Sequence, residues 1–200
     1  MPQPFSFHRL RARCRLVLLW GLFLVFPRLG HAGGTATEYS VKAAFIYNFA
    51  RFIQWPPGTF SSKDGAIVLG VLGEGDFPAD LQAINGRSVP GHGQNRVISL
   101  KRLAGPQDID HCQILFILHS GEGLTPAVMR EAGARNMLTV VEDCGDLAQT
   151  GAVINLFKTE GNRIRFEINV DAAKRADLSI DSPLLNLAKM VREHRTGPGN

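Results

Sequence analysis

Three predicted strands of this chain end at residues whose types could do chemistry. The three groups are Gly70-Val-Leu-Gly73-Glu-Gly75, His119-Ser120, and Glu142-Asp143 with Asp146. In open α/β sheets, ligands bind at the carboxyl ends of the strands, so each group stands where a binding or catalytic site would be expected. Residue type and spacing then decide what each group can do.

The glycine group follows a strand and precedes a helix, which is the position of a dinucleotide-binding fingerprint. Its spacing is GxxGxG, whereas the fingerprint is GxGxxG. An ordinary strand-to-helix turn is therefore the favoured interpretation, with nucleotide binding near Gly73 as the alternative.

The other two groups do not assemble a recognised catalytic set. His119 and Ser120 are neighbours in sequence rather than members of a triad, and the chain lacks a GxSxG nucleophile elbow. The acidic group could support general acid–base chemistry, but helix capping around Asp143 is the simpler interpretation. Four histidines have no partner at metal-ligand spacing: His92, His111, His119 and His194. We predict no catalytic residue, no metal site and no cofactor.

Residues 1–32 have the pattern of an export signal. Basic residues at 8–13 precede an apolar run at 16–26, and Gly30-His31-Ala32 fits a cleavage site. The apolar run is too short to span a bilayer comfortably. We expect cleavage after Ala32, a single domain over residues 33–195 in the periplasm of a Gram-negative source, and a disordered tail at 196–200.

Most of the positive charge lies in that signal. The full chain has a formal net charge of +4, but the signal holds five arginines and no acidic residue, so 17 of the 22 basic residues remain beside all 18 acidic ones. A nearly neutral domain gives no electrostatic support for nucleic-acid binding.

Strands alternate with helices through the middle of the chain, which predicts a three-layer α/β fold with a mostly parallel, Rossmann-like sheet flanked by helices. The predicted strands are 66–72, 96–100, 113–119 and 137–141, and the predicted helical segments are 77–84, 125–134 and 146–149. The last third predicts a β-hairpin (152–158 and 163–169), a short helix (171–176) and a terminal helix (182–195).

Polar and apolar residues alternate along strand 163–169. Arg163, Arg165, Glu167 and Asn169 occupy one face, which predicts a wet face opposite a buried one. The wet face could be merely solvated, or it could be a polar recognition strip beside an apolar patch, as interfaces favour.

Residues 38–56, EYSVKAAFIYNFARFIQWP, predict a helix with two apolar sides. One stripe holds Val41, Ala44, Phe45, Phe49 and Phe52, and the other holds Tyr39, Ala43, Ile46, Ala50 and Ile53. Thr35 and Glu38 fit a capping box, and Pro56 ends the helix. A helix that is apolar on two sides must be covered on two sides, either within the core or by another protein. We expect Tyr39, Ile46 and Ala50 to meet a second helix or a second subunit.

Several blocks of sequence, in order, resemble the YfiR/HmsC-like family across almost the whole predicted domain. The blocks are KAAFIYNFARFIQWP (42–56), CQILFI (112–117), MLTVVED (137–143), GAVINL (151–156), IRFEINVDAA (164–173) and LSIDSPLLNLAKMV (178–191). The resemblance implies a periplasmic α/β protein without catalytic activity, often dimeric. Such a protein would hold the periplasmic sensor domain of a membrane-bound diguanylate cyclase and thereby lower cyclic-di-GMP synthesis and biofilm formation. An outer-membrane-associated regulator is a further implied partner.

The cysteines depart from the family pattern. Cys14 leaves with the signal, and the strand pattern puts Cys112 and Cys144 at opposite ends of parallel strands. Members of the family commonly carry further cysteines in disulfides, but here Gly70 stands where the partner of Cys112 is expected, and Cys144 lacks a close partner before Gly151. We expect both thiols to be unpaired, although an oxidising compartment would permit a disulfide.

The sequence leads to two alternative hypotheses for the function. In the first, the strand containing Arg165, Phe166, Glu167, Ile168 and Asn169, with its adjoining loops, binds the cyclase, and Tyr39, Ile46 and Ala50 support a homodimer. In the second, the chain is a periplasmic small-ligand or nucleotide-binding protein, or an enzyme of unrecognised class, that uses the strand ends near Gly73, His119 and Asp143.

Overall fold

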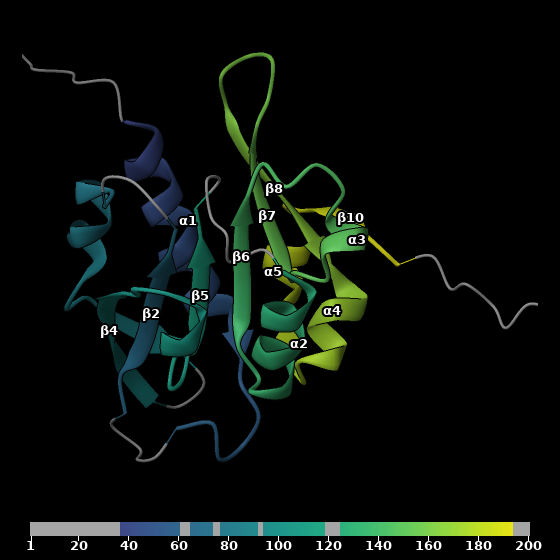
Figure 1. The fold of residues 1–200 in the computed structure, drawn as a ribbon. Helices are drawn as coiled ribbons and strands as arrows, with labels where there is room; N and C mark the ends of the chain where they lie inside the picture. The colour runs from purple at the N-terminus through teal and green to yellow at the C-terminus, as the bar shows by residue number, and fades with distance from the viewer. Residues whose placement is uncertain (1–36, 61–64, 74–76, 92–93, 119–124, 194–200) are drawn as a thin grey trace, which may run out of the picture. The chain divides into compact units, whose positions relative to one another are not determined.

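A mixed eight-stranded sheet organises the computed structural model, which describes residues 37–60, 65–73, 77–91, 94–118 and 125–193 (Figure 1). The strands are β2 (Ile67–Leu72), β3 (Ser88–Gly91), β4 (Gln94–Arg102), β5 (Ile114–Ile117), β6 (Leu138–Glu142), β7 (Ile154–Lys158), β8 (Ile164–Asn169) and β10 (Lys189–Val191). Their order is β10-β8-β7-β6-β5-β2-β4-β3. The five strands from β4 to β7 are parallel, β3 pairs antiparallel with β4, and β8 pairs antiparallel with β7 and in parallel with β10. The predicted α/β class is confirmed.

Helices cover both faces of this sheet (Figure 1). Helix α1 (Glu38–Phe52) packs on one face, and α2 (Pro126–Ala134) and α3 (Leu147–Thr150) pack on the other. Shorter elements complete the chain: the 3-10 helices η1 (Ala79–Ile84) and η2 (Pro106–Asp108), and helices α4 (Val170–Arg175) and α5 (Ser182–Leu185). Among the described residues, no helix is both long and apolar enough to cross a membrane.

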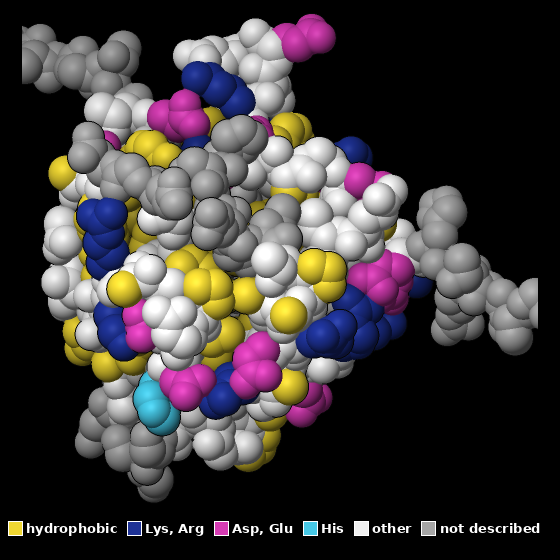
Figure 2. Space-filling view, viewed as in Figure 1, with side chains coloured by type: hydrophobic (Ala, Val, Ile, Leu, Met, Phe, Trp, Pro, Cys, Tyr) yellow, Lys and Arg dark blue, Asp and Glu magenta, His cyan; other side chains and the backbone are white. Residues whose placement is uncertain are grey.

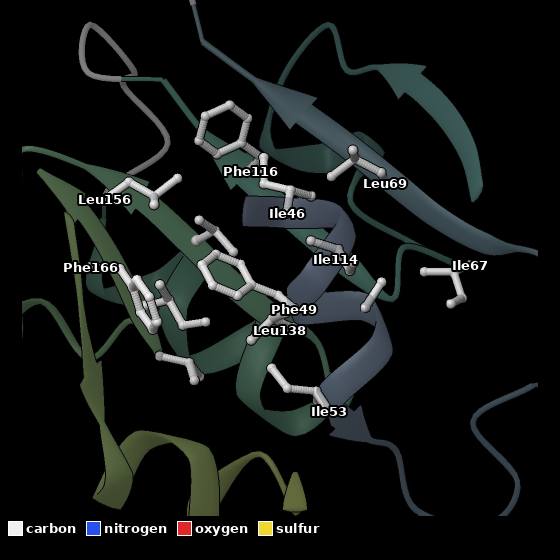
Figure 3. Close-up of a cluster of buried hydrophobic side chains, with 14 of the residues drawn as sticks. Ile46, Phe49, Ile53, Ile67, Leu69, Ile114, Phe116, Leu138, Leu156 and Phe166 are labelled. Atoms are coloured by element: carbon white, nitrogen blue, oxygen red, sulfur yellow. The ribbon is translucent and has the colours of Figure 1, made fainter. Parts of the chain in front are cut away.

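The main core lies between α1 and the sheet. Figure 3 shows Ile46 and Phe49 of α1, with Ile53 just after the helix, directed onto side chains of five strands: Ile67, Leu69, Ile114, Phe116, Leu138, Leu156 and Phe166. The rings of Phe49 and Phe166 meet edge to face with their centroids 5.2 Å apart. Such a contact adds roughly 0.5–1.5 kcal/mol to the free energy gained by burial alone.

The burial of α1 corrects the surface expected for self-association. Ile46 is 0% exposed and Ala50 is 4% exposed, both within the core of the same chain, and Tyr39 is half-buried. Neither Ile46 nor Ala50 is free to contact a second subunit. The residues of the other stripe differ in exposure: Phe49 is wholly buried in the core, Phe45 is half-buried and Ala44 is exposed. Periodicity shows two apolar stripes but does not show that residues of both face the sheet.

The ends of α1 also differ from the prediction. Thr37 is the N-cap, and its hydroxyl accepts a hydrogen bond from the Ser40 N–H, whereas Thr35 lies outside the described residues. The helix ends at Phe52 because the next two residues form strand β1 (Ile53–Gln54), which pairs antiparallel with β9 (Ser179–Ile180).

The sequence analysis did not predict two further strands, β10 and β3. The predicted terminal helix (182–195) is only α5, after which residues 189–191 form β10 and pair in parallel with β8. This pairing satisfies backbone groups that β8 would otherwise present at an open edge. Residues 88–91, expected to form a loop, make edge strand β3, where Pro90 is tolerated. The predicted signal (1–32) and tail (196–200) lie outside the described residues.

Replacing Phe49 with alanine should lower the free energy of unfolding by about 3–5 kcal/mol, because the ring is wholly buried and a cavity would replace it. Phe52→Ala, on the same helix but only half-buried, is the matched control and should cost clearly less. Urea unfolding measures both variants, and an equal loss in the two would contradict the packing of α1 described above.

Candidate interaction surface

A buried ion-pair cluster joins the first turns of α1 to the end of β6. Lys42 Nζ lies 2.9 Å from Glu142 Oε1 and 2.6 Å from Glu38 Oε1. Tyr39 donates a hydrogen bond to Glu142 Oε2 at 3.3 Å, and Lys158 of β7 donates to Glu38 Oε2 at 3.0 Å. Lys42 and Glu142 are only 2% and 4% exposed. The cluster therefore fixes α1 against the carboxyl ends of two neighbouring strands.

The electrostatics of this cluster favour a structural role. Burial acts to lower the pKa of Lys42, but hydrogen bonds and attraction from Glu38 and Glu142 outweigh it, so the pKa lies above its ordinary value. Hydrogen bonds from Lys42 and Lys158 likewise lower the pKa of Glu38. A lysine that holds its proton at neutral pH is not a nucleophile or a general base. Sequence analysis missed this pair because its members lie 100 residues apart.

The acidic group after β6 supports local structure. Asp146, rather than Asp143, caps α3 by accepting from the Ala148 N–H. Asp143 adopts a left-handed φ of 44° and accepts from the backbone N–H of Lys158. Across the described ranges, no three His, Cys, Asp or Glu side chains lie close enough together to hold a metal ion.

The glycine group is a close-packed turn as far as the structure describes it. A Cβ on Gly73 would come within 2.7 Å of Leu118 Cβ, and the backbone φ of +145° also favours glycine there. Gly75 and His119-Ser120 lie outside the described residues.

The two cysteines are free thiols in different settings. Cys112 is buried, and burial raises its pKa. Cys144 is half-buried, and burial raises its pKa to about 11, so neither thiol ionises readily at neutral pH. Gly70 lies directly against Cys112, since a Cβ added there would be 2.6 Å from its sulfur.

The strand predicted to bind a partner is largely covered by its own chain. Arg165 is exposed, but Phe166, Glu167, Ile168 and Asn169 are buried. Phe166 and Ile168 belong to the core beneath α1. The face expected to be wet is therefore not wet at positions 167 and 169.

Contacts made by distant residues explain this burial. Glu167 accepts from the side-chain amide of Asn155 and pairs with Lys189 of β10 at 3.1 Å. Asn169 accepts from two backbone N–H groups at the start of α4 and donates to Glu193. Alternation alone could not show that residues beyond position 185 return to cover this strand.

A groove lies beside that strand, between α1 and the projecting β7–β8 hairpin (Figure 1). Its volume is about 370 Å³, and Val41, Phe45 and Ile164 supply its apolar lining. Phe45 packs against the core, because its ring centroid lies 5.4 Å from that of Phe166. The charged lining residues are Glu38, which pairs with Lys158 at 3.0 Å, and Arg163, which leaves one net positive charge. Supported apolar side chains beside polar ones are typical of protein interfaces.

A second apolar patch lies at the β10 edge of the sheet. Leu187 is 73% exposed and Met190 is 46% exposed. Met190 is in register with Ile168, whose side chain lies in the core under α1, so Met190 stands on the α1 side of the sheet. The patch and the groove therefore share one face.

The opposite face has mixed charge. Figure 2 views the molecule from the side of α2, where basic and acidic side chains lie next to one another rather than in areas of one sign.

The described residues form an α/β domain with a mostly parallel sheet between layers of helices. The model of the YfiR/HmsC-like family matches residues 39–189, which span every strand of the large sheet except β10, where the match ends at its first residue. The chain belongs to the YfiR/HmsC-like family, as its sequence blocks predicted. No curated protein matches the chain.

Replacing Lys42 with methionine should destabilise the protein by about 3–5 kcal/mol, because the Glu142 carboxylate would stay buried without its cation. The double variant Lys42→Met, Glu142→Leu should recover most of that loss, since it removes both charges. Urea unfolding of the two variants tests this coupling. A double variant as unstable as the sum of its single changes would show that the pair is not coupled.

Replacing Gly70 with cysteine should create a disulfide with Cys112 under oxidising conditions, because the two positions are in contact. Loss of one pair of free thiols, measured by thiol titration of the unfolded protein, is the expected result. Gly161→Cys, on the exposed hairpin, should leave its thiol free. Free thiols at both positions would mean that β2 and the residue before β5 are not aligned as described.

Proposed function

We propose that this protein inhibits a membrane-bound diguanylate cyclase by binding its periplasmic sensor domain, and so represses cyclic-di-GMP synthesis and biofilm formation. The family match over residues 39–189 carries this proposal. We further propose that residues 1–32 direct export and that the domain over residues 33–195 acts in the periplasm without catalysing a reaction.

The groove between α1 and the β7–β8 hairpin is the surface we assign to the cyclase. Val41, Phe45 and Ile164 offer an apolar anchor site, and Arg163 favours an acidic side chain on the partner, since Lys158 is already paired with Glu38. This assignment moves the contact from the buried strand 166–169 to the adjoining side of the hairpin.

Inhibition requires that the groove discriminate between two states of the sensor. The protein would bind the inactive form better than the active form, because a ligand shifts an equilibrium only by its difference in affinity. To move a cyclase from about 1% to about 99% inactive, that difference must approach 10⁴-fold. An outer-membrane-associated regulator that occupied the same surface would release the cyclase by competition.

We also propose that two copies associate through the β10 edge of the sheet. Leu187 and Met190 are exposed there, whereas Ile46 and Ala50 are covered by the chain itself. This dimer would leave the groove open to the cyclase, because the groove is lined by residues of α1 and of the hairpin.

Replacing Arg163 with glutamate should weaken binding to the purified sensor domain at least about tenfold, a loss near 1.4 kcal/mol, because it reverses a charge in the groove. Arg165→Glu is the matched control: it makes the same charge change at an exposed position two residues away, but it lies outside the groove lining. Isothermal titration calorimetry compares the two variants, with circular dichroism to check the fold.

Cyclic-di-GMP levels in cells should follow the binding data, rising with Arg163→Glu and changing little with Arg165→Glu. Equal effects of the two variants would place the contact elsewhere on the hairpin. A wild-type protein that binds no sensor domain, and whose deletion leaves cyclic-di-GMP unchanged, would overturn the proposed function itself.

A further inference from the structure

A larger hollow lies between α2 and α4, which stand beside each other in Figure 1. Its volume is about 580 Å³, within the range of pockets that hold small organic molecules. Much of its wall is apolar and comes from Met129, Met137, Val153, Ala172 and Ala176. No residue of the groove assigned to the cyclase takes part in this wall.

Gly133 keeps this hollow open. It lies inside α2, where glycine is less favourable than alanine by about 0.8–1.0 kcal/mol. A Cβ at this position would meet no atom within 4 Å, and the backbone φ is not in the positive region that would demand glycine. Neither backbone conformation nor close packing therefore accounts for a glycine at position 133, which faces empty space in the wall of the hollow.

The lining also contains two guanidinium groups. Arg175 is held by Glu193, with an Nη2–Oε1 distance of 2.6 Å. Arg130 is exposed and, among the residues described, has neither an ion-pair partner nor a hydrogen-bond acceptor. A positive charge without a protein partner beside an apolar hollow is complementary to a molecule that is apolar at one end and anionic at the other.

Thr139 contributes a buried donor to the same lining. Its side-chain oxygen accepts from the Val153 N–H at 2.8 Å, and its residue is 3% exposed. No described residue accepts the hydroxyl proton, which is left for an oxygen of a bound molecule.

We propose that the hollow between α2 and α4 binds a small organic carboxylate with an apolar body. The apolar body lies against Met129, Met137 and Val153, and the carboxylate pairs with Arg130. This site is separate from the cyclase-binding groove, and the proposal does not depend on cyclase inhibition.

Titration of the purified protein with decanoate, followed by calorimetry and by thermal unfolding, tests the proposal. Saturable 1:1 binding and a rise in Tm are expected. Decanol, which has the same chain without the charge, should bind at least about tenfold more weakly. Arg130→Gln should remove this preference and bring the two affinities within about threefold of each other.

Gly133→Leu fills the hollow and should weaken decanoate binding at least about tenfold while keeping or raising the Tm of the unliganded protein, since leucine is the better helix former. Ala44→Leu adds similar bulk at an exposed position of α1 and should change neither. Equal binding by the two leucine variants would overturn the proposed site. So would the absence of saturable binding of both decanoate and 2-naphthoate up to about 1 mM.

Discussion

The packing of α1 on the sheet is the constraint on which the rest of the molecule depends. Ile46 and Phe49 of the helix, and Ile53 directly after it, contact side chains of five strands, and the helix is fixed at both ends. At its start the Lys42–Glu142 pair is nearly excluded from water, and at its end two residues pair with β9. A buried ion pair adds little net stability compared with an apolar pair of the same shape. Its geometric effect is to set where along the strands the helix can lie.

That placement determines which surfaces are available for binding. Residues of both stripes of α1 are used for the core, while Val41 and Phe45 lie beside the hairpin. The second hollow lies between α2 and α4 and shares no lining residue with the groove. The two proposed sites could therefore be occupied at the same time. If both are occupied in the cell, the second would give the protein a means of sensing its surroundings.

Local pattern predicted the interior of this fold better than its edges. The apolar run at residues 114–117 and the Thr125-Pro126 start of α2 were predictable, because burial on both faces and helix capping leave a local signature. Strand β10 left no such signature, since its three residues are defined by pairing with β8. The prediction of a wet face on β8 was wrong for the same reason, because Glu167 and Asn169 are covered by contacts with Lys189 and Glu193. The family was recognisable because its blocks of sequence recur in order, which requires no knowledge of contacts.

The pairing of β1 with β9 has a consequence for the order in which the chain becomes folded. Gln54 donates to Asp181 across 127 positions of sequence, and Ile53 is in register with Ile180. When the chain is synthesised from its N-terminus, the residues of α1 and β1 are made well before β9, the strand that pairs with β1. Until residues 179–191 are made, β1 and the outer edge of β8 both lack their partner strands and stay open to other chains and to proteases. A copy truncated before β9 would therefore leave β1 and the outer edge of β8 unpaired.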